Sequence, residues 1–125
     1  MKNMSEDYLL IKYFIDKAKI LALEFKEQEK IALELGIGDY ITEDIANDWF
    51  TDDIKFLNEL KEKKLISYKS VELFFMINAN FTEASLNGNS FEKDIWTLKG
   101  LENHVFWKKQ RGLALEFIVE LSRLE

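Results

Sequence analysis

Apolar residues recur at helical spacing through the first 35 residues. They stand at Leu10, Phe14, Ala18, Leu21 and Phe25, and the pattern continues through Ala32 to Leu35. This spacing predicts a helix that begins after an N-cap at Ser5 and ends before Gly36, a residue suited to the left-handed position after a helix. A second apolar set (Leu9, Ile11, Ile15, Ile20, Ala22 and Leu23) widens the stripe and predicts a central helix. The pattern leaves open whether residues 6–35 form one helix or break near "KEQEK".

The next helical pattern begins near residue 42. Thr42 is the expected N-cap, and the apolar side carries Ile45, Trp49, Phe56 and Leu60. Thr51 offers a second start, so one kinked helix and two short helices both fit the pattern. The basic sequence "KEKK" suits the C-terminal end, where the helix dipole favours cations.

Residues 71–85 carry a third pattern, opened by Ser67 or Ser70 as N-cap. Val71, Phe74, Asn78, Phe81 and Ser85 share one helical face. The segment "VELFFMI" (71–77) also fits a buried strand, but the length and the apolar positions at 74, 77 and 81 favour a helix.

The remainder predicts a turn, an irregular or short helical segment and a final helix. The turn is "LNGNS" at 86–90, with its Asn-Gly pair. The final helix starts near Asn103 and has an apolar stripe at Phe106, Leu113, Phe117, Leu121 and Leu124. Gly112 costs this helix up to about 1 kcal/mol relative to alanine, and a close helix crossing would explain its presence.

These elements, together with the complete lack of proline, predict one all-α domain over residues 1–125, a bundle of four or five helices. The net charge of −6 argues against nucleic acid as the main ligand. No apolar run approaches the roughly 20 residues of a membrane span, and the N-terminus has no signal-peptide pattern. A cytoplasmic location is therefore expected, in agreement with the absence of cysteine.

The sequence offers little catalytic chemistry. The single histidine, His104, has no recognisable partner and is expected to be a capping or surface residue. Glycine loops for phosphate, paired zinc-binding histidines and cysteine nucleophiles are all missing from the sequence, so no enzyme activity and no cofactor are predicted. In "FWKKQR" (106–111) Trp107 is the one aromatic outside the apolar stripe, and pairing with the acids of 39–53 is a structural role for the three cations.

The segment 39–53 is an uncompensated acidic run with six carboxylates and no lysine or arginine. If it is helical, Asp44, Asp48 and Asp52 stack on one face. A solvated face and a surface for a basic partner both explain such a run. A metal site fits less well, because no turning loop gathers the oxygens, and none is predicted. The predicted partner-binding residues are Asp44, Asp48, Trp49, Asp52 and Asp53, since tryptophan amid charged residues is typical of binding hot spots.

Three segments resemble the small acidic helical immunity proteins of bacterial polymorphic toxin systems. They are "DIANDWFTDDI", "LKEKKLISYKSVELFFMI" and "DIWTLKGLENHVFWKKQRGLALEFIVEL", within about residues 44–121. The resemblance implies direct inhibition of a cognate toxin, often a basic nuclease, by occlusion of its substrate surface. The function predicted is therefore a non-enzymatic protein-binding module for a basic partner.

A second hypothesis is a structural or regulatory protein that self-associates. The wide apolar stripe of "YLLIKYFI" would then be buried in a homodimer.

Overall fold

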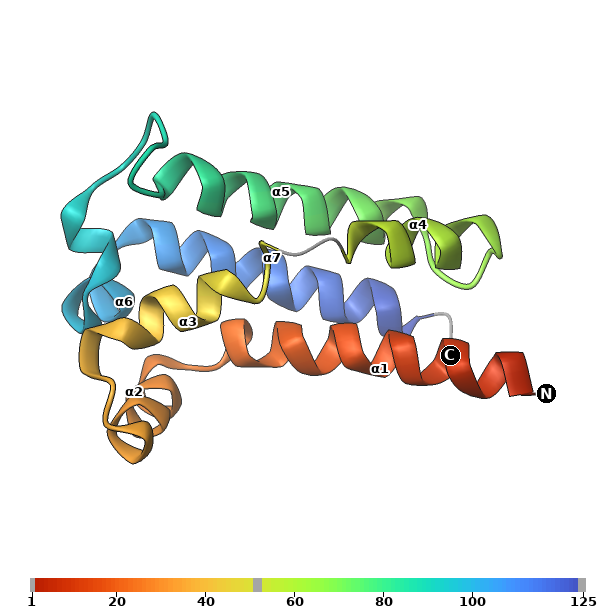
Figure 1. Ribbon diagram of the computed structural model, residues 1–125, viewed down its shortest axis with the longest axis horizontal. Helices are drawn as coiled ribbons and strands as arrows, with labels where there is room; N and C mark the ends of the chain where they lie inside the picture. The colour runs from red at the N-terminus through yellow and green to blue at the C-terminus, as the bar shows by residue number, and fades with distance from the viewer. Residues whose placement is uncertain (1, 51–52, 124–125) are drawn as a thin grey trace.

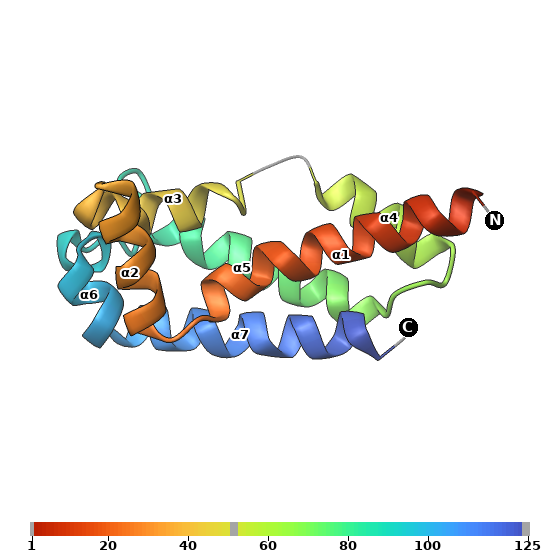
Figure 2. The ribbon, with the colours of Figure 1, turned by 90° about the horizontal axis from the view of Figure 1, so that it is seen from below.

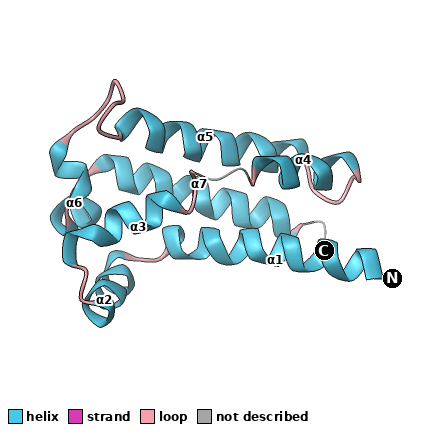
Figure 3. Ribbon diagram, viewed as in Figure 1, coloured by secondary structure: helices cyan, strands magenta, loops and turns pink. Residues whose placement is uncertain are grey.

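The computed structural model describes residues 2–50 and 53–123, and within these ranges the chain is helical without a strand (Figure 3). The all-α prediction is confirmed, and the strand alternative for 71–77 is excluded. The number of helices was predicted wrongly: the described residues form seven α-helices rather than four or five. They are α1 (Lys2–Ala22), α2 (Phe25–Leu35), α3 (Ile41–Asn47), α4 (Ile54–Glu62), α5 (Tyr68–Ala84), α6 (Leu98–Asn103) and α7 (Val105–Ser122). Two short 3₁₀ helices, η1 (Gly38–Tyr40) and η2 (Lys93–Trp96), complete the set.

The long helices α1, α5 and α7 run along the long axis of the molecule, and α7 packs against both of the others (Figure 1). Helices α3 and α4 follow one another along the same axis (Figure 2). Helices α2 and α6 lie at the end of the molecule opposite the two termini. The extra helices thus arise because two of the expected long helices are each divided into two.

The first division separates α1 from α2 at Leu23 and Glu24, just before "KEQEK". The buried side chain of Gln28 donates from Nε2 to the carbonyl oxygens of Ile20 (3.1 Å) and Leu21 (3.2 Å). These carbonyls belong to the last turn of α1 and lack partners within the helix, so Gln28 stabilises the break. Ser5 lies inside α1, because the helix begins at Lys2, and the predicted N-cap is wrong.

The end of α2 agrees with the prediction. Gly36 has φ of 66° and donates to the carbonyl of Leu33, while Ile37 donates to that of Ala32. This pair of bonds is the Schellman arrangement, and the left-handed conformation it requires is one that glycine adopts without strain.

The second division separates α3 from α4. Thr42 is not the N-cap of α3, since the helix begins at Ile41; the Thr42 hydroxyl is buried and donates to the carbonyl of Asp39 (2.8 Å). In α4 the core residue beside Leu60 is Leu57, and the predicted Phe56 is 36% exposed. Thr51, the predicted restart, lies outside the described residues.

Helix α5 begins at the predicted cap, because the Ser67 side chain accepts from the Ser70 amide. The turn at 86–90 and the short helical character of 91–103 are also confirmed. None of the helices in the described ranges combines the length and the apolar character that a membrane crossing requires.

Helix α7 is rotated relative to its predicted stripe. Its buried residues are Trp107, Gln110, Ala114, Phe117 and Leu121. Phe117 and Leu121 match the prediction, Phe106 and Leu113 are only half-buried, and Leu124 lies outside the described residues. Gly112 is exposed, and a Cβ atom there would meet nothing within 4 Å, so the close helix crossing is wrong.

An aromatic cluster forms the centre of the core. Phe74 from α5 lies 5.2 Å from Trp49, 5.9 Å from Phe14 and 6.1 Å from Phe117 between ring centroids. All four side chains are at most 2% exposed. Each comes from a different part of the chain, so this cluster holds α1, α5, α7 and the end of α3 together.

Candidate functional site

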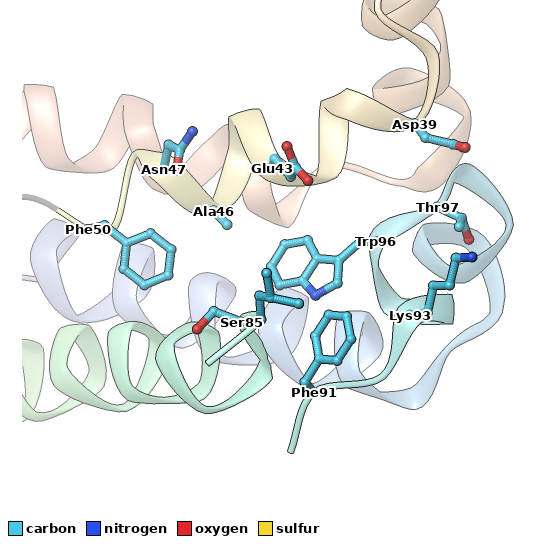
Figure 4. A pocket seen from close by; sticks show the side chains of 11 residues that line it. Asp39, Glu43, Ala46, Asn47, Phe50, Ser85, Phe91, Lys93, Trp96 and Thr97 are labelled. Atoms are coloured by element: carbon cyan, nitrogen blue, oxygen red, sulfur yellow. The ribbon is translucent and has the colours of Figure 1, made fainter. Parts of the chain in front are cut away.

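An open cleft of about 530 Å³ lies between α3 and the chain segment that connects α5 to α6 (Figure 4). Helix α3 contributes Glu43, Ala46 and Asn47, and Phe50 follows directly after it. The opposite wall comes from residues 85–97, with Asp39 from η1 at one end. A volume of this size is within the range of sites that bind small molecules or several side chains.

Three aromatic side chains line this cleft. Phe50 is 42% exposed, Phe91 is 39% exposed, and Trp96 is half-buried. Trp96 is fixed in place: its indole N–H donates to the carbonyl of Ala84 (2.9 Å), and its ring meets that of Trp107 edge-on at 6.0 Å. The Trp96 ring is therefore held in place before any ligand arrives, which lowers the entropic cost of binding to it.

The connecting segment is held close to α5 by its backbone. The Ser90 amide donates to the carbonyl of Glu83 (2.8 Å), and the Gly88 amide donates to that of Ser85 (2.8 Å). A Cβ atom at Gly88 would collide with the Glu83 carbonyl, so this approach requires glycine. The Asn-Gly pair noted in the sequence thus sets the path of the wall that carries Phe91.

Three charged side chains line the cleft, and they differ in what they contact. Asp39 Oδ1 accepts from the amide of Leu98 (2.7 Å). Lys93 lies toward the end of the cleft formed by Asp39 and Thr97 in Figure 4. Glu43 is exposed and makes no hydrogen bond or ion pair within the described residues. Glu43 is therefore the carboxylate that remains available to a ligand.

Trp49, one of the predicted partner-binding residues, lies in the core rather than at the surface. Trp49 has no exposed surface and packs against Phe74 and Phe117 in the core. Asn78 donates to its carbonyl, and its indole N–H has no partner within the described residues. A partner cannot touch this side chain while the fold is intact, so Trp49 is a core residue.

The predicted carboxylates differ in their exposure. Asp44 is exposed in the first turn of α3, and Asp48 is half-buried directly after the helix. Burial raises the pKa of the Asp48 carboxyl, with a smaller contribution from Asp44 and an opposing one from Lys17. Asp52 lies outside the described residues.

Asp53 stabilises the fold through contacts with α1. Its Oδ2 accepts from the ammonium of Lys17 (2.8 Å) and from the hydroxyl of Tyr13 (2.8 Å). Lys17 is only 7% exposed, and its ammonium also lies 4.7 Å from the centre of the Tyr13 ring. A buried cation needs such a partner, so Asp53 holds the start of α4 against α1.

The basic segment 106–111, within α7, contributes two structural side chains. Trp107, predicted to be outside the apolar stripe, is fully buried and donates to the carbonyl of Ile95 (2.7 Å). Arg111 does not pair with the acidic run but donates to the carbonyls of Leu23 and Leu101 and to Oε1 of Gln28. Burial lowers its pKa. Arg111 thereby ties the α1–α2 break to α6.

His104 is the N-cap of α7, which confirms its predicted capping role. Its Nδ1 accepts from the Phe106 amide (3.0 Å), and its Nε2 lies 2.6 Å from Glu92 Oε2. Both ring nitrogens are committed to these contacts, so the ring is a structural clamp between the connecting segment and α7.

The sequence analysis missed the cleft residues Phe50, Phe91 and Trp96 as a group. The available signal was their position: each is a large aromatic residue outside a long helix, close to a turn or a helix end. Within the described residues no group of histidine, aspartate and glutamate side chains has the arrangement of a metal site.

No family model, curated protein or solved structure matches this chain. Its function is therefore argued from the cleft.

Proposed function

We propose that this chain is a protein-binding module that neutralises a basic bacterial toxin by direct contact through the open aromatic cleft. The observation that carries the proposal is the combination of exposed aromatic rings with the unpaired Glu43 carboxylate in one cleft. Aromatic anchors in a partly enclosed site are typical of interface hot spots. The resemblance of three sequence segments to immunity proteins supports a toxin as the partner.

Charge supports a basic partner. The chain carries a net charge of −6, so its field attracts a basic protein from a distance and raises the association rate. The cleft then supplies the apolar contact that long-range attraction lacks. In this proposal the acidic run contributes through Glu43 rather than through Asp48 or Trp49.

Two adjacent carboxylates allow a matched test. Glu43 and Asp44 both lie exposed in the first turn of α3, but only Glu43 lines the cleft. Tagged wild-type protein, Glu43→Lys and Asp44→Lys are used to capture proteins from a lysate of the native cell, at low and high salt. Thermal unfolding of each variant serves as the check on folding.

The expected result is one basic protein retained by wild type and by Asp44→Lys, lost by Glu43→Lys, and weakened by salt. That protein, expressed alone, should stop bacterial growth, and co-expression of the wild-type module should restore it. Retention by a folded Glu43→Lys variant contradicts the role of the cleft. A captured protein without toxicity contradicts the neutralising function.

Self-association is the second candidate, favoured by exposed apolar side chains on α1. Tyr8 is 54% exposed, Leu9 62% and Tyr13 46%. Sedimentation at several protein concentrations separates the two candidates, because a concentration-independent monomer contradicts a homodimer.

A further inference from the structure

We propose that the cleft receives an arginine side chain of the partner, with its guanidinium against the Glu43 carboxylate and the aromatic wall of Trp96 and Phe50. This inference rests on the proposed function and names the residue chemistry that the cleft recognises. Three properties of the cleft support it: its charge, its aromatic rings and its dimensions.

The charge of the cleft favours a cation at one end. Asp39 and Lys93 line the same end of the cleft, next to Thr97 (Figure 4), so their opposite charges offset each other there. Glu43 has no comparable cation within the described residues. The uncompensated charge of the cleft is therefore negative, and it lies on the α3 side.

The aromatic rings favour arginine over lysine. A guanidinium is planar and weakly hydrated, so it can stack on an aromatic ring while it donates two parallel hydrogen bonds to a carboxylate. Figure 4 shows the Trp96 ring beneath Glu43 and the Phe50 ring farther along the same cleft. A lysine ammonium is a hydrated point charge and can use the carboxylate but gains less from the rings.

The dimensions of the cleft leave room for an apolar neighbour of the arginine. The volume of about 530 Å³ exceeds that of one side chain, and Leu86 (75% exposed) and Phe91 continue the apolar wall. A partner segment that carries an arginine beside a large apolar residue fills both parts. The probe that represents this segment is the tripeptide acetyl-Leu-Arg-Leu-amide.

The test follows the indole N–H signal of Trp96 by NMR while the tripeptide is added. Trp49 is fully buried and does not line the cleft, so its indole signal serves as the internal reference. The matched peptides replace arginine with citrulline, which keeps the shape without the charge, or with lysine. The arginine peptide should bind about tenfold or more tightly than the citrulline peptide and severalfold more tightly than the lysine peptide.

Two variants locate the effect. Glu43→Gln should abolish the preference for arginine over citrulline, whereas Asp44→Asn should keep it. Equal affinity for the arginine and citrulline peptides, or an unchanged preference in Glu43→Gln, overturns the inference.

The two proposals fail in different ways. A Glu43-dependent toxin partner combined with no arginine preference overturns only this inference. A clear arginine preference combined with a harmless partner overturns only the neutralising function.

Discussion

The molecule contains two aromatic clusters that resemble each other in composition and differ in closure. Phe14, Trp49, Phe74 and Phe117 form a core with at most 2% exposure, surrounded by helices on all sides. Phe50, Phe91 and Trp96 line an open cleft between α3 and the segment 85–97. Trp49 and Phe50 are neighbours in the sequence, yet they belong to different clusters.

The difference shows that the end of α3 decides which of these two aromatic residues is exposed. The helix stops at Asn47, and the chain then turns, so Trp49 enters the core and Phe50 faces the cleft. Aromatic content alone does not separate the buried cluster from the rings that line the cleft; the path of the backbone does.

Replacement of Phe74 by alanine should have the largest effect of the changes considered. It removes a fully packed ring that touches three other rings, and large-to-small changes of this kind cost about 3–5 kcal/mol. Phe91→Ala, the matched change in the cleft, should alter the free energy of unfolding by less than about 1 kcal/mol, as exposed positions do. Urea unfolding of both variants measures the contrast, and comparable losses would mean that the cleft is part of the core.

The two buried tryptophans, Trp49 and Trp107, allow the effects of the same substitution to be compared at two sites in the core. Trp107 donates to the carbonyl of Ile95, whereas the indole N–H of Trp49 has no partner within the described residues. Trp→Phe reduces volume at both sites, but only at 107 does it leave a carbonyl without its donor. Trp107→Phe should therefore be more destabilising than Trp49→Phe by about 1–2 kcal/mol. Equal unfolding free energies would contradict this account of the two indoles.

A substitution on the exposed side of α7 should raise the free energy of unfolding, whereas the substitutions in the core lower it. Gly112 lies in the helix interior, and a Cβ atom there has open space. Gly112→Ala should raise the free energy of unfolding by up to about 1 kcal/mol, because alanine loses less backbone entropy on helix formation. Gly88→Ala is the matched control and should destabilise, since its Cβ meets the Glu83 carbonyl. Thermal unfolding of both variants tests the pair, and a loss of stability in Gly112→Ala would indicate a contact at this site.

Much of the fold follows from the sequence because helical periodicity is a local property. The stripe through Phe14, Ala18 and Leu21 is buried as predicted, and Ser67 and Gly36 act as caps. The break between α1 and α2 depends on Gln28, which reaches back to carbonyls seven and eight residues earlier in the chain. A hydrogen bond of that kind depends on how the two helices pack, so periodicity does not reveal it.

The site was harder to predict than the fold, because it depends on how each helix is rotated about its axis and on where each helix ends. Trp49 amid carboxylates has the composition of a hot spot, and only tertiary packing assigns it to the core. Asp53 belongs to the acidic run by sequence, but the buried Lys17, 36 residues earlier, makes it a structural ion-pair partner. Glu43 and Trp96 come together from different elements, and one sequence contains no signal for that pairing.

Asp48, which directly precedes Trp49 and Phe50 in the chain, should produce the smallest effect. Because burial raises its pKa in the folded state, the native protein binds this proton at a higher pH than the unfolded chain does. The free energy of unfolding therefore rises as the pH falls through the folded-state pKa of Asp48. This added stability is absent at neutral pH. Asp48→Asn removes this titration, so the variant should be slightly more stable than wild type at neutral pH, and the difference should shrink as the solution becomes acidic.

Urea unfolding of both proteins between about pH 7 and pH 4 measures this difference. The comparison of the two curves isolates Asp48, because every other carboxylate titrates in both proteins. If the free energies of unfolding of the two proteins change with pH in the same way, water reaches Asp48 as freely as it reaches Asp44. The buried core then ends at Trp49 and does not include Asp48.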